Sequence, residues 1–205
     1  MSQSHPLSFA PVSLEDIPTL AQIHHDAFAT NILIHLMYGD DSDSGLVSDL
    51  QNTLQTDQTA RLTKAIDNKT GEIIGWSMWN SYLDKETLTA ALKAAEDRLT
   101  SPPKNSICPD LYLDLKRAVI AKRKLWIMER STSVLNILVV RPQDQGKGVG
   151  KALVLAGLEE ARRKGLQAWL EASTEGYALY RRCGFRDAGD PIEMDMAKYG
   201  HDAKT

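Results

Sequence analysis

A glycine-rich segment in the last third of the chain carries the clearest chemical signal. It follows an almost wholly apolar run and consists of Gln145, Gly146, Lys147, Gly148, Val149, Gly150 and Lys151. Glycines let a backbone approach a ligand closely, and N–H groups that converge at the start of a helix bind anions. The segment is therefore predicted to hold an anion, with a turn that binds nothing as the alternative.

The spacing of these glycines excludes two common nucleotide-binding motifs. A phosphate loop for nucleoside triphosphates needs glycine at position 145 and serine or threonine at position 152, where this chain has Gln145 and Ala152. A dinucleotide fingerprint that begins at Gly146 or Gly148 needs a third glycine at position 151 or 153, and neither residue is glycine. The spacing thus indicates an anion of another kind.

The cysteines give no sign of a metal centre. Cys108 and Cys183 have neither the spacing of metal ligands nor that of a disulfide framework, so we expect a reduced chain that holds no metal. Free cysteines are usually buried and inert, which argues against Cys183 as a covalent nucleophile.

Hydrophobic periodicity predicts the strands and helices that position the glycine-rich segment. We expect strands over residues 7–12, 61–66, 72–79, 134–140, 167–172 and 192–196. Helices are expected over residues 14–28, 46–55, 84–99, 109–129, 150–164 and 176–182. Ser13 and Asp16 resemble a capping box at the start of the first helix. The pattern predicts an α/β fold in a single domain, residues 1–205, with a helical insertion at about 83–131.

The composition is that of a folded chain. Of its 205 residues, 42% are hydrophobic and 25% are charged, and the net charge of −3 is too small for a disordered protein. No run approaches the roughly 20 apolar residues of a membrane span, and residues 1–14 lack the pattern of a secretory signal. The basic residues near 116–124 lack interleaved aromatic residues. We expect no membrane or nucleic-acid partner and a location in the cytoplasm, with the nucleus as the alternative.

The charges are unevenly distributed along the chain. Residues 1–60 contain eight acidic residues and no Lys or Arg, which leaves the remainder with an excess of five positive charges. Acidic residues gather in an expected loop over 39–45 and again near the end: Asp40, Asp41 and Asp43, and Asp190, Glu193 and Asp195. An acidic rim attracts protonated amines. The alternative is a solvated acidic face without a partner.

Three segments within residues 134–187 together resemble the GCN5-related N-acetyltransferases (GNAT). The pattern Gln145-x-x-Gly148-x-Gly150 matches the family's Q/R-x-x-G-x-G/A signature, and the preceding run LVVRP is similar to the family's L-x-V-x-P. Further on, LEAS at 170–173 and ALYRRCGF at 178–185 resemble the family's L-x-A-S and L-Y-x-x-x-G-F. The first half of the chain resembles the family only in the order of its elements.

The resemblance implies a fold and a cosubstrate. The fold is a mixed, mostly antiparallel sheet that splays at an acetyl-CoA cleft, is flanked by helices, and has the helical insertion between its third and fourth strands. The acetyl-CoA-binding core would span about residues 133–187, and Arg141, Lys147 and Lys151 would add positive charge, with solvated surface as the alternative for at least one. The implied cofactor-binding residues are Leu138, Val139, Val140, Gln145, Gly146, Lys147, Gly148, Val149, Gly150, Lys151, Ser173 and Tyr180.

The resemblance also suggests which side chains move protons. Tyr180 would be the general acid that protonates the departing thiolate, with core packing as the alternative. Many relatives carry an acid on the strand before the glycines, whereas here Asn136 is the only polar residue of that strand. Glu171, on the strand across the cleft, is therefore the first candidate for the general base. His24, His25 and a chain of waters are the alternatives.

These features predict an acetyl-CoA-dependent N-acetyltransferase that transfers an acetyl group directly to a primary amine in a ternary complex. The acidic first portion favours a small cationic acceptor, at a pocket partly walled by the helical insertion. A protein lysine or N-terminal acetyltransferase is one alternative, and a CoA-binding protein without catalysis is another. We expect a monomer or a homodimer.

Overall fold

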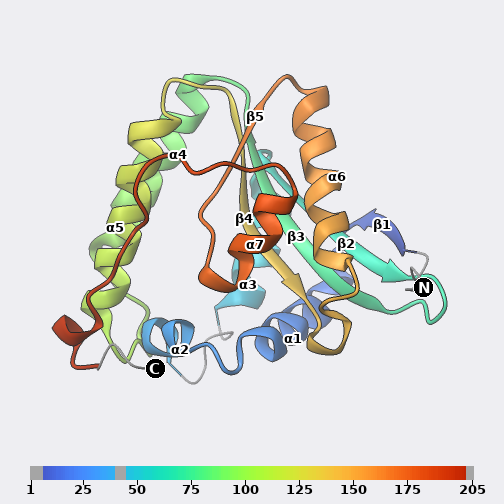
Figure 1. Ribbon diagram of the computed structural model, residues 1–205, viewed down its shortest axis with the longest axis horizontal. Coiled ribbons are helices and arrows are strands. Elements are labelled where there is room, and N and C mark those ends of the chain that lie inside the picture. Colours follow the sequence, from blue (N-terminus) through green and yellow to red (C-terminus); the bar gives the residue numbers. More distant parts are fainter. Residues whose placement is uncertain (1–6, 40–44, 202–205) are drawn as a thin grey trace.

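The computed structural model describes residues 7–39 and 45–201, so the acidic loop positions Asp40, Asp41 and Asp43 lie outside the described residues. Within these ranges five strands form one sheet in the order β1-β2-β3-β4-β5 (Figure 1). The strands are β1 (Leu7–Pro11), β2 (Ala60–Asp67), β3 (Ile73–Tyr82), β4 (Thr132–Val140) and β5 (Gln167–Leu170). Only β4 and β5 run parallel, which confirms the expected mixed, mostly antiparallel sheet.

Helices cover both faces of the sheet. The helices are α1 (Ile17–Phe28), α2 (Ile32–Tyr38), α3 (Leu46–Thr56), α4 (Lys85–Asp97), α5 (Pro109–Trp126), α6 (Val149–Arg163) and α7 (Thr174–Arg182). Helices α1 and α6 both pack on β3 and β4, and neighbouring residues of β4 divide between them. Val139 belongs to the cluster with α1, and Val140 belongs to the cluster with α6.

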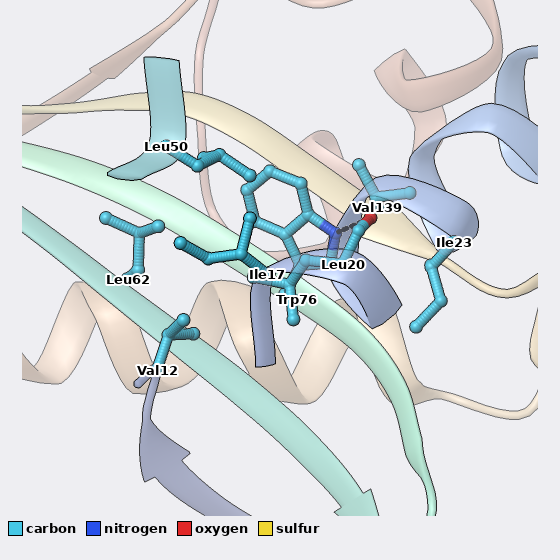
Figure 2. Packing of buried hydrophobic residues seen from close by; sticks show 8 residues of the cluster. All are labelled: Val12, Ile17, Leu20, Ile23, Leu50, Leu62, Trp76 and Val139. Atoms are coloured by element: carbon cyan, nitrogen blue, oxygen red, sulfur yellow. Dashed lines mark hydrogen bonds between the residues drawn. The ribbon is translucent and has the colours of Figure 1, made fainter. Parts of the chain in front are cut away.

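The central core links the first third of the chain to the sheet (Figure 2). Trp76 of β3 is fully buried, and its indole N–H donates a hydrogen bond to the carbonyl of Leu20, 3.1 Å away. Ile17, Leu50 and Val139 belong to the same buried cluster. These contacts hold α1 and α3 against the strands that precede the glycine-rich segment.

One glycine allows α6 to lie close to the sheet. A Cβ atom at Gly157 would stand 2.2 Å from the indole ring of Trp79, far below any van der Waals contact. Because the site has no room for a side chain, the helix axis can approach β3 closely. This packing fixes the direction in which α6 leaves the glycine-rich segment at its N-terminal end.

The helical insertion between the third and fourth strands is confirmed. It consists of α4, a 3₁₀ turn at Arg98–Thr100, and α5, which lie side by side in Figure 1. Leu88 and Leu92 of α4 pack against Tyr82 and Val134 of the sheet. None of the helices in the described residues is long and apolar enough to cross a membrane.

The observed fold differs from the predicted elements in two places. The helix α2 was not predicted, although the Asn31 side chain caps it by accepting a hydrogen bond from the Ile34 N–H. The closing strand expected over residues 192–196 is wrong, because this segment pairs with no strand of the described sheet. Its alternating Met194 and Met196 instead pack against α2 and α5. The alternation therefore reflects packing on helices, which the sequence cannot distinguish from packing in a sheet.

The last part of the chain consequently runs along α5 (Figure 1). Asp114 of α5 accepts hydrogen bonds from Lys198 and Tyr199, and Lys122 donates one to the carbonyl of Asp190. The ring of Trp126 lies 2.9 Å from the place that a Cβ of Gly189 would occupy. The insertion and the C-terminal segment thus form one wall beside the end of β5.

Candidate functional site

The strands β4 and β5 separate halfway along β4. Their pairing extends from Thr132 opposite Gln167 to Leu135 opposite Leu170 and goes no further. On the other side of β4, Trp79 pairs with Leu135 and Met78 with Ile137, which leaves Asn136 as an extra residue in a β-bulge. The bulge lies at the point where the pairing with β5 ends, so the last part of β4 has no neighbouring strand on that side, as expected for a sheet that splays there.

The glycine-rich segment follows β4 and ends in the first turn of α6. Gly146 and Gly148 have φ angles of +74° and +92°, a left-handed conformation that costs a residue with a side chain about 1–2 kcal/mol. Gly148 is the N-cap residue of α6 and offers no side chain to the N–H groups of the first turn. The sequence thus supplies glycine where the backbone must turn into the helix.

The backbone N–H groups of this segment are available to a ligand. Gln145 and Ala152 each donate a backbone hydrogen bond, but none of the hydrogen bonds among the described residues is donated by the backbone of residues 146–151. The hydrogen bonds found among the described residues therefore leave these six successive N–H groups unused, at the positive end of the α6 dipole. This arrangement has the character of an anion site.

Gly150 has a different role from the other two glycines. A Cβ at this position would lie 3.4 Å from the Leu179 side chain and 3.6 Å from that of Val140. The first turn of α6 therefore lies against both α7 and the end of β4. The φ angle of Gly150 is not positive, and a Cβ there would make only ordinary van der Waals contacts, so its packing among the described residues does not require glycine.

Two of the three basic residues near the segment are paired with acids. The Asp144 carboxylate accepts hydrogen bonds from Arg141 at 2.7 Å and from Lys147 at 3.0 Å, and Arg141 also pairs with Glu72 at 3.1 Å. Burial raises the pKa of Asp144, but the hydrogen bonds from the two cations outweigh it and hold that pKa below its usual value. Arg141 and Lys147 hold the turn together, whereas Lys151 forms no ion pair with a described residue.

Tyr180 lies on α7, next to the first turn of α6. Its ring packs edge-on against Phe185, with the centroids 6.1 Å apart, and against the small Gly176. Burial, with a smaller contribution from Cys183, raises the pKa of the Tyr180 phenol above its usual value. Its hydroxyl has no hydrogen-bond partner among the described residues. The phenol is thus a protonated donor that remains free for a ligand.

The side chains around Tyr180 have structural roles. Ser173, a predicted cofactor-binding residue, caps α7 by accepting a hydrogen bond from the Gly176 N–H at 3.2 Å. Burial raises the pKa of the Cys183 thiol, which keeps it protonated and poorly nucleophilic. The expectation that Cys183 forms no covalent intermediate agrees with this setting.

Glu171, the candidate general base, is held by a guanidinium group. Its carboxylate accepts hydrogen bonds from Nε and Nη2 of Arg123, at 3.0 and 2.6 Å, and from the Trp169 indole at 2.6 Å. Arg123 Nη2 also donates to Oδ1 of Asn136 at 3.0 Å. No sequence motif points to Arg123, which lies on the insertion 48 residues away from Glu171. The role of Glu171 as a base stays a prediction.

The other candidate bases lie on α1. His24 packs on Phe28 with the ring centroids 4.7 Å apart, as expected for the apolar stripe of the helix. His25 follows it on the exposed side. Among the described residues no group of three His, Cys, Asp or Glu side chains is arranged to hold a metal ion.

Comparison with known proteins identifies the fold. Residues 115–187 match a protein-family model described as an acetyltransferase (GNAT) domain. A mosquito arylalkylamine N-acetyltransferase-like protein, 5b, has a similar structure, with a TM-score of 0.64 and 14% identity over 90% of this chain and 85% of that one. A predicted acetyltransferase from Clostridium acetobutylicum, solved with acetyl-CoA, has a TM-score of 0.55 and 16% identity over 96% of this chain and 100% of that one.

A third similar structure is described as histone acetyltransferase HPA2 and related acetyltransferase, from Corynebacterium glutamicum. Its TM-score is 0.60, with 21% identity over 92% of this chain and 90% of that one. At such identities the likeness concerns the fold alone. The resemblance that the sequence motifs indicated is supported by the family model matched over residues 115–187.

Proposed function

The chain carries an acetyltransferase (GNAT) domain, matched over residues 115–187, and from this premise we propose that it transfers the acetyl group of acetyl-CoA to a primary amine. The transfer is direct, in a ternary complex. A bond forms between the amine nitrogen and the acetyl carbon, the carbon–sulfur bond breaks, the nitrogen loses a proton and the sulfur gains one.

One observation carries the proposal. A row of unpaired N–H groups at residues 146–151 follows the part of β4 that no longer pairs with β5. The free stretch of β4 after Asn136 offers backbone groups to an extended arm with amide bonds, as a further strand would. The N–H groups of the glycine-rich segment offer hydrogen bonds to a pyrophosphate. Acetyl-CoA has both parts in this order and supplies an activated thioester.

Several residues would hold acetyl-CoA. Leu138, Val139 and Val140 would contribute backbone groups to the arm, although the Val140 carbonyl already accepts a hydrogen bond from the Gln145 side chain at 3.0 Å. Residues 146–151 would bind the pyrophosphate through their backbone N–H groups, whereas the Gln145 N–H already donates to the carbonyl of Pro142. Lys151, which lacks an ion pair among the described residues, would be the basic side chain nearest to a phosphate.

Tyr180 would supply the proton that the sulfur needs. The raised pKa keeps the phenol protonated at neutral pH, and its hydroxyl is free to donate. A thiol has a pKa of about 8.5 and a tyrosine one of about 10, so the proton moves uphill by only about 2 kcal/mol at ordinary values. A donor at this position can therefore assist the departure of the sulfur.

The proposed acceptor is a small cationic amine. Support comes from the acidic first 60 residues and from the likeness to the mosquito protein named for arylalkylamines. Five of the eight acidic residues lie in the described part: Glu15, Asp16, Asp26, Asp49 and Asp57. The likeness to the Corynebacterium structure, described as a histone acetyltransferase and related acetyltransferase, favours a lysine side chain as the second candidate.

Release of free thiol from acetyl-CoA tests the proposal. The assay compares polyamines, arylalkylamines, aminoglycosides, acidic amino acids and a lysine-containing peptide, at low and high salt. We expect thiol release with a cationic amine and a KM that rises with ionic strength. Release with the peptide alone would favour the second candidate. Binding of acetyl-CoA without release by any acceptor would indicate a protein that binds CoA and does not catalyse transfer.

A further inference from the structure

A chain of polar side chains crosses the sheet where β4 and β5 separate. It begins at Glu171, just after β5, and continues through Arg123 of α5 to Asn136 in the bulge of β4. Asn136 Nδ2 then donates to Oδ1 of Asn80 at 2.7 Å, and Asn80 Nδ2 donates to Oδ2 of Asp57 at 2.9 Å. These hydrogen bonds thus connect the insertion, the strands β3 and β4, the segment just after β5, and the end of α3.

The charges at the two ends fix the direction of both amides. Arg123 is a cation and donates to Oδ1 of Asn136, while Asp57 is an anion and accepts from Nδ2 of Asn80. A flip of either carboxamide would place N–H against the guanidinium or oxygen against the carboxylate. Asn136 therefore presents a fixed amide that has one further lone pair on Oδ1 and one further N–H.

The Asn136 side chain is open to a ligand although it belongs to a central strand. Asn80 is buried, with 6% of its surface exposed, whereas Asn136 is exposed at the point where the pairing of β4 with β5 has ended. Leu138, two residues further on, lies on the stretch of β4 that the proposed function assigns to the arm of acetyl-CoA. Asn136 is thus an oriented polar group at the edge of the proposed cleft.

The surroundings of Glu171 favour a positioning role for it over that of a base. Three N–H groups donate to its two oxygens. The Glu171 carboxylate is the ion-pair partner of Arg123, whose side chain is only 19% exposed. An uncompensated cation in such a place is costly. The pair is therefore better suited to hold Arg123 against Asn136 than to accept protons in each cycle.

We propose that Oδ1 of Asn136 binds the N–H of the acceptor amine, and that Arg123 and Glu171 are positioning residues that hold the carboxamide in place. This inference rests on the proposed function. An amide oxygen accepts a hydrogen bond without carrying a charge, so it orients the amine without stabilising the ammonium form as a carboxylate does. The carboxamide therefore orients the reacting nitrogen, whereas the attraction of a cationic acceptor depends on the acidic residues elsewhere in the chain.

The experiment uses the full chain and the best amine from the thiol-release assay. Asn136→Ala, with Asn136→Ser as a milder second variant, should raise the KM for the amine about 10-fold, which corresponds to a lost hydrogen bond of about 1.4 kcal/mol. Both should retain the thermal shift that acetyl-CoA gives the wild type. Asn52→Ala is the matched control, because Asn52 is exposed on α3 and its side chain forms none of the hydrogen bonds found among the described residues.

The tests of Arg123 and Glu171 must measure quantities that a purely structural role of these residues would leave unchanged. Glu171→Gln and Arg123→Ala should raise the same KM, and adding either to Asn136→Ala should have little further effect, because the residues act through one hydrogen bond. Glu171→Gln should keep the acidic limb of the kcat/KM profile. Arg117→Lys on the same helix is the control for Arg123→Lys, which loses the two-pronged contact with Glu171.

Three outcomes would overturn the inference. They are an unchanged KM in Asn136→Ala and Asn136→Ser, loss of the acetyl-CoA thermal shift in both, and loss of the acidic limb in Glu171→Gln. A wild type that releases no thiol with any amine, whether or not it binds acetyl-CoA, would instead refute the proposed function itself.

Discussion

The side-chain amide of Gln145 donates a hydrogen bond to the carbonyl oxygen of Val140, the last residue of β4, at 3.0 Å. The first residue of the glycine signature therefore closes the turn that the glycines form. Its side chain acts on the backbone of this chain, and the row of free N–H groups begins directly after it. The signature thus describes how the turn is built as well as how it binds.

Gln145→Ala should loosen the turn without removing any proposed ligand group. We expect a loss of about 1 kcal/mol in stability, or about 2–4 °C in Tm, and weaker binding of acetyl-CoA by isothermal titration calorimetry. Gln143→Ala is the control, since Gln143 is exposed two residues earlier and its side chain forms none of the hydrogen bonds found among the described residues. Equal affinity in the two variants would show that the hydrogen bond to Val140 does not shape the site.

Gly148→Val should abolish the binding of acetyl-CoA. Saturating acetyl-CoA should raise the wild-type Tm by about 5–10 °C, and we expect no such shift in the variant. Gly165→Val is a matched control, because both glycines have a positive φ, +92° and +69°, and open space around the missing Cβ. Both substitutions should cost a similar amount of stability, so a thermal shift retained by Gly148→Val would refute the assignment of the glycine-rich segment.

Tyr180→Phe should lower kcat about 10- to 1000-fold and leave acetyl-CoA binding nearly unchanged. Because burial raises the pKa of Tyr180, the phenol stays protonated, and no loss of kcat due to its ionisation should occur below about pH 10. Tyr177→Phe on the same helix is the control, since the Tyr177 hydroxyl donates to Asp187 at the surface. A Tyr180→Phe enzyme with the wild-type rate from pH 6 to 9 would make Tyr180 a packing residue.

Asp144→Asn should destabilise the protein in a pH-dependent way. The pKa of Asp144 is lower in the folded protein than its usual value of 3.8, so its carboxylate stabilises the fold at pH values above 3.8. That contribution is lost as the pH falls through the lowered pKa. We expect the variant to be about 1–3 kcal/mol less stable at pH 7 and the difference to shrink toward pH 2.

Urea unfolding at a series of pH values measures this effect. Asp187→Asn is the control, because Asp187 pairs with Arg181 at the surface, with 58% of its side chain exposed. Surface pairs of this kind contribute little. A pH-independent difference between wild type and Asp144→Asn would contradict the ionic role of Asp144.

The sequence by itself determined the parts of this protein that depend on local pattern. The apolar run before Arg141, the glycines at 146, 148 and 150, and the good helix formers after them predict a strand, a turn and a helix in that order. The insertion could also be predicted from the sequence. A proline at 109 and the Ala/Leu/Lys/Glu-rich stretch over 84–99 indicate helices, and no strand pattern contradicts them. Each of these signals acts over a few residues, so it survives without knowledge of the partner elements.

Only the tertiary structure decided which distant residues meet. The bulge at Asn136 arises from the register between β3 and β4, and Arg123 reaches Glu171 because α5 lies beside the end of β5. The same holds for residues 192–196, whose alternation fits a strand but whose methionines pack on α2 and α5. Contacts between residues far apart in the chain depend on how whole elements pack, and a pattern within one element cannot specify them.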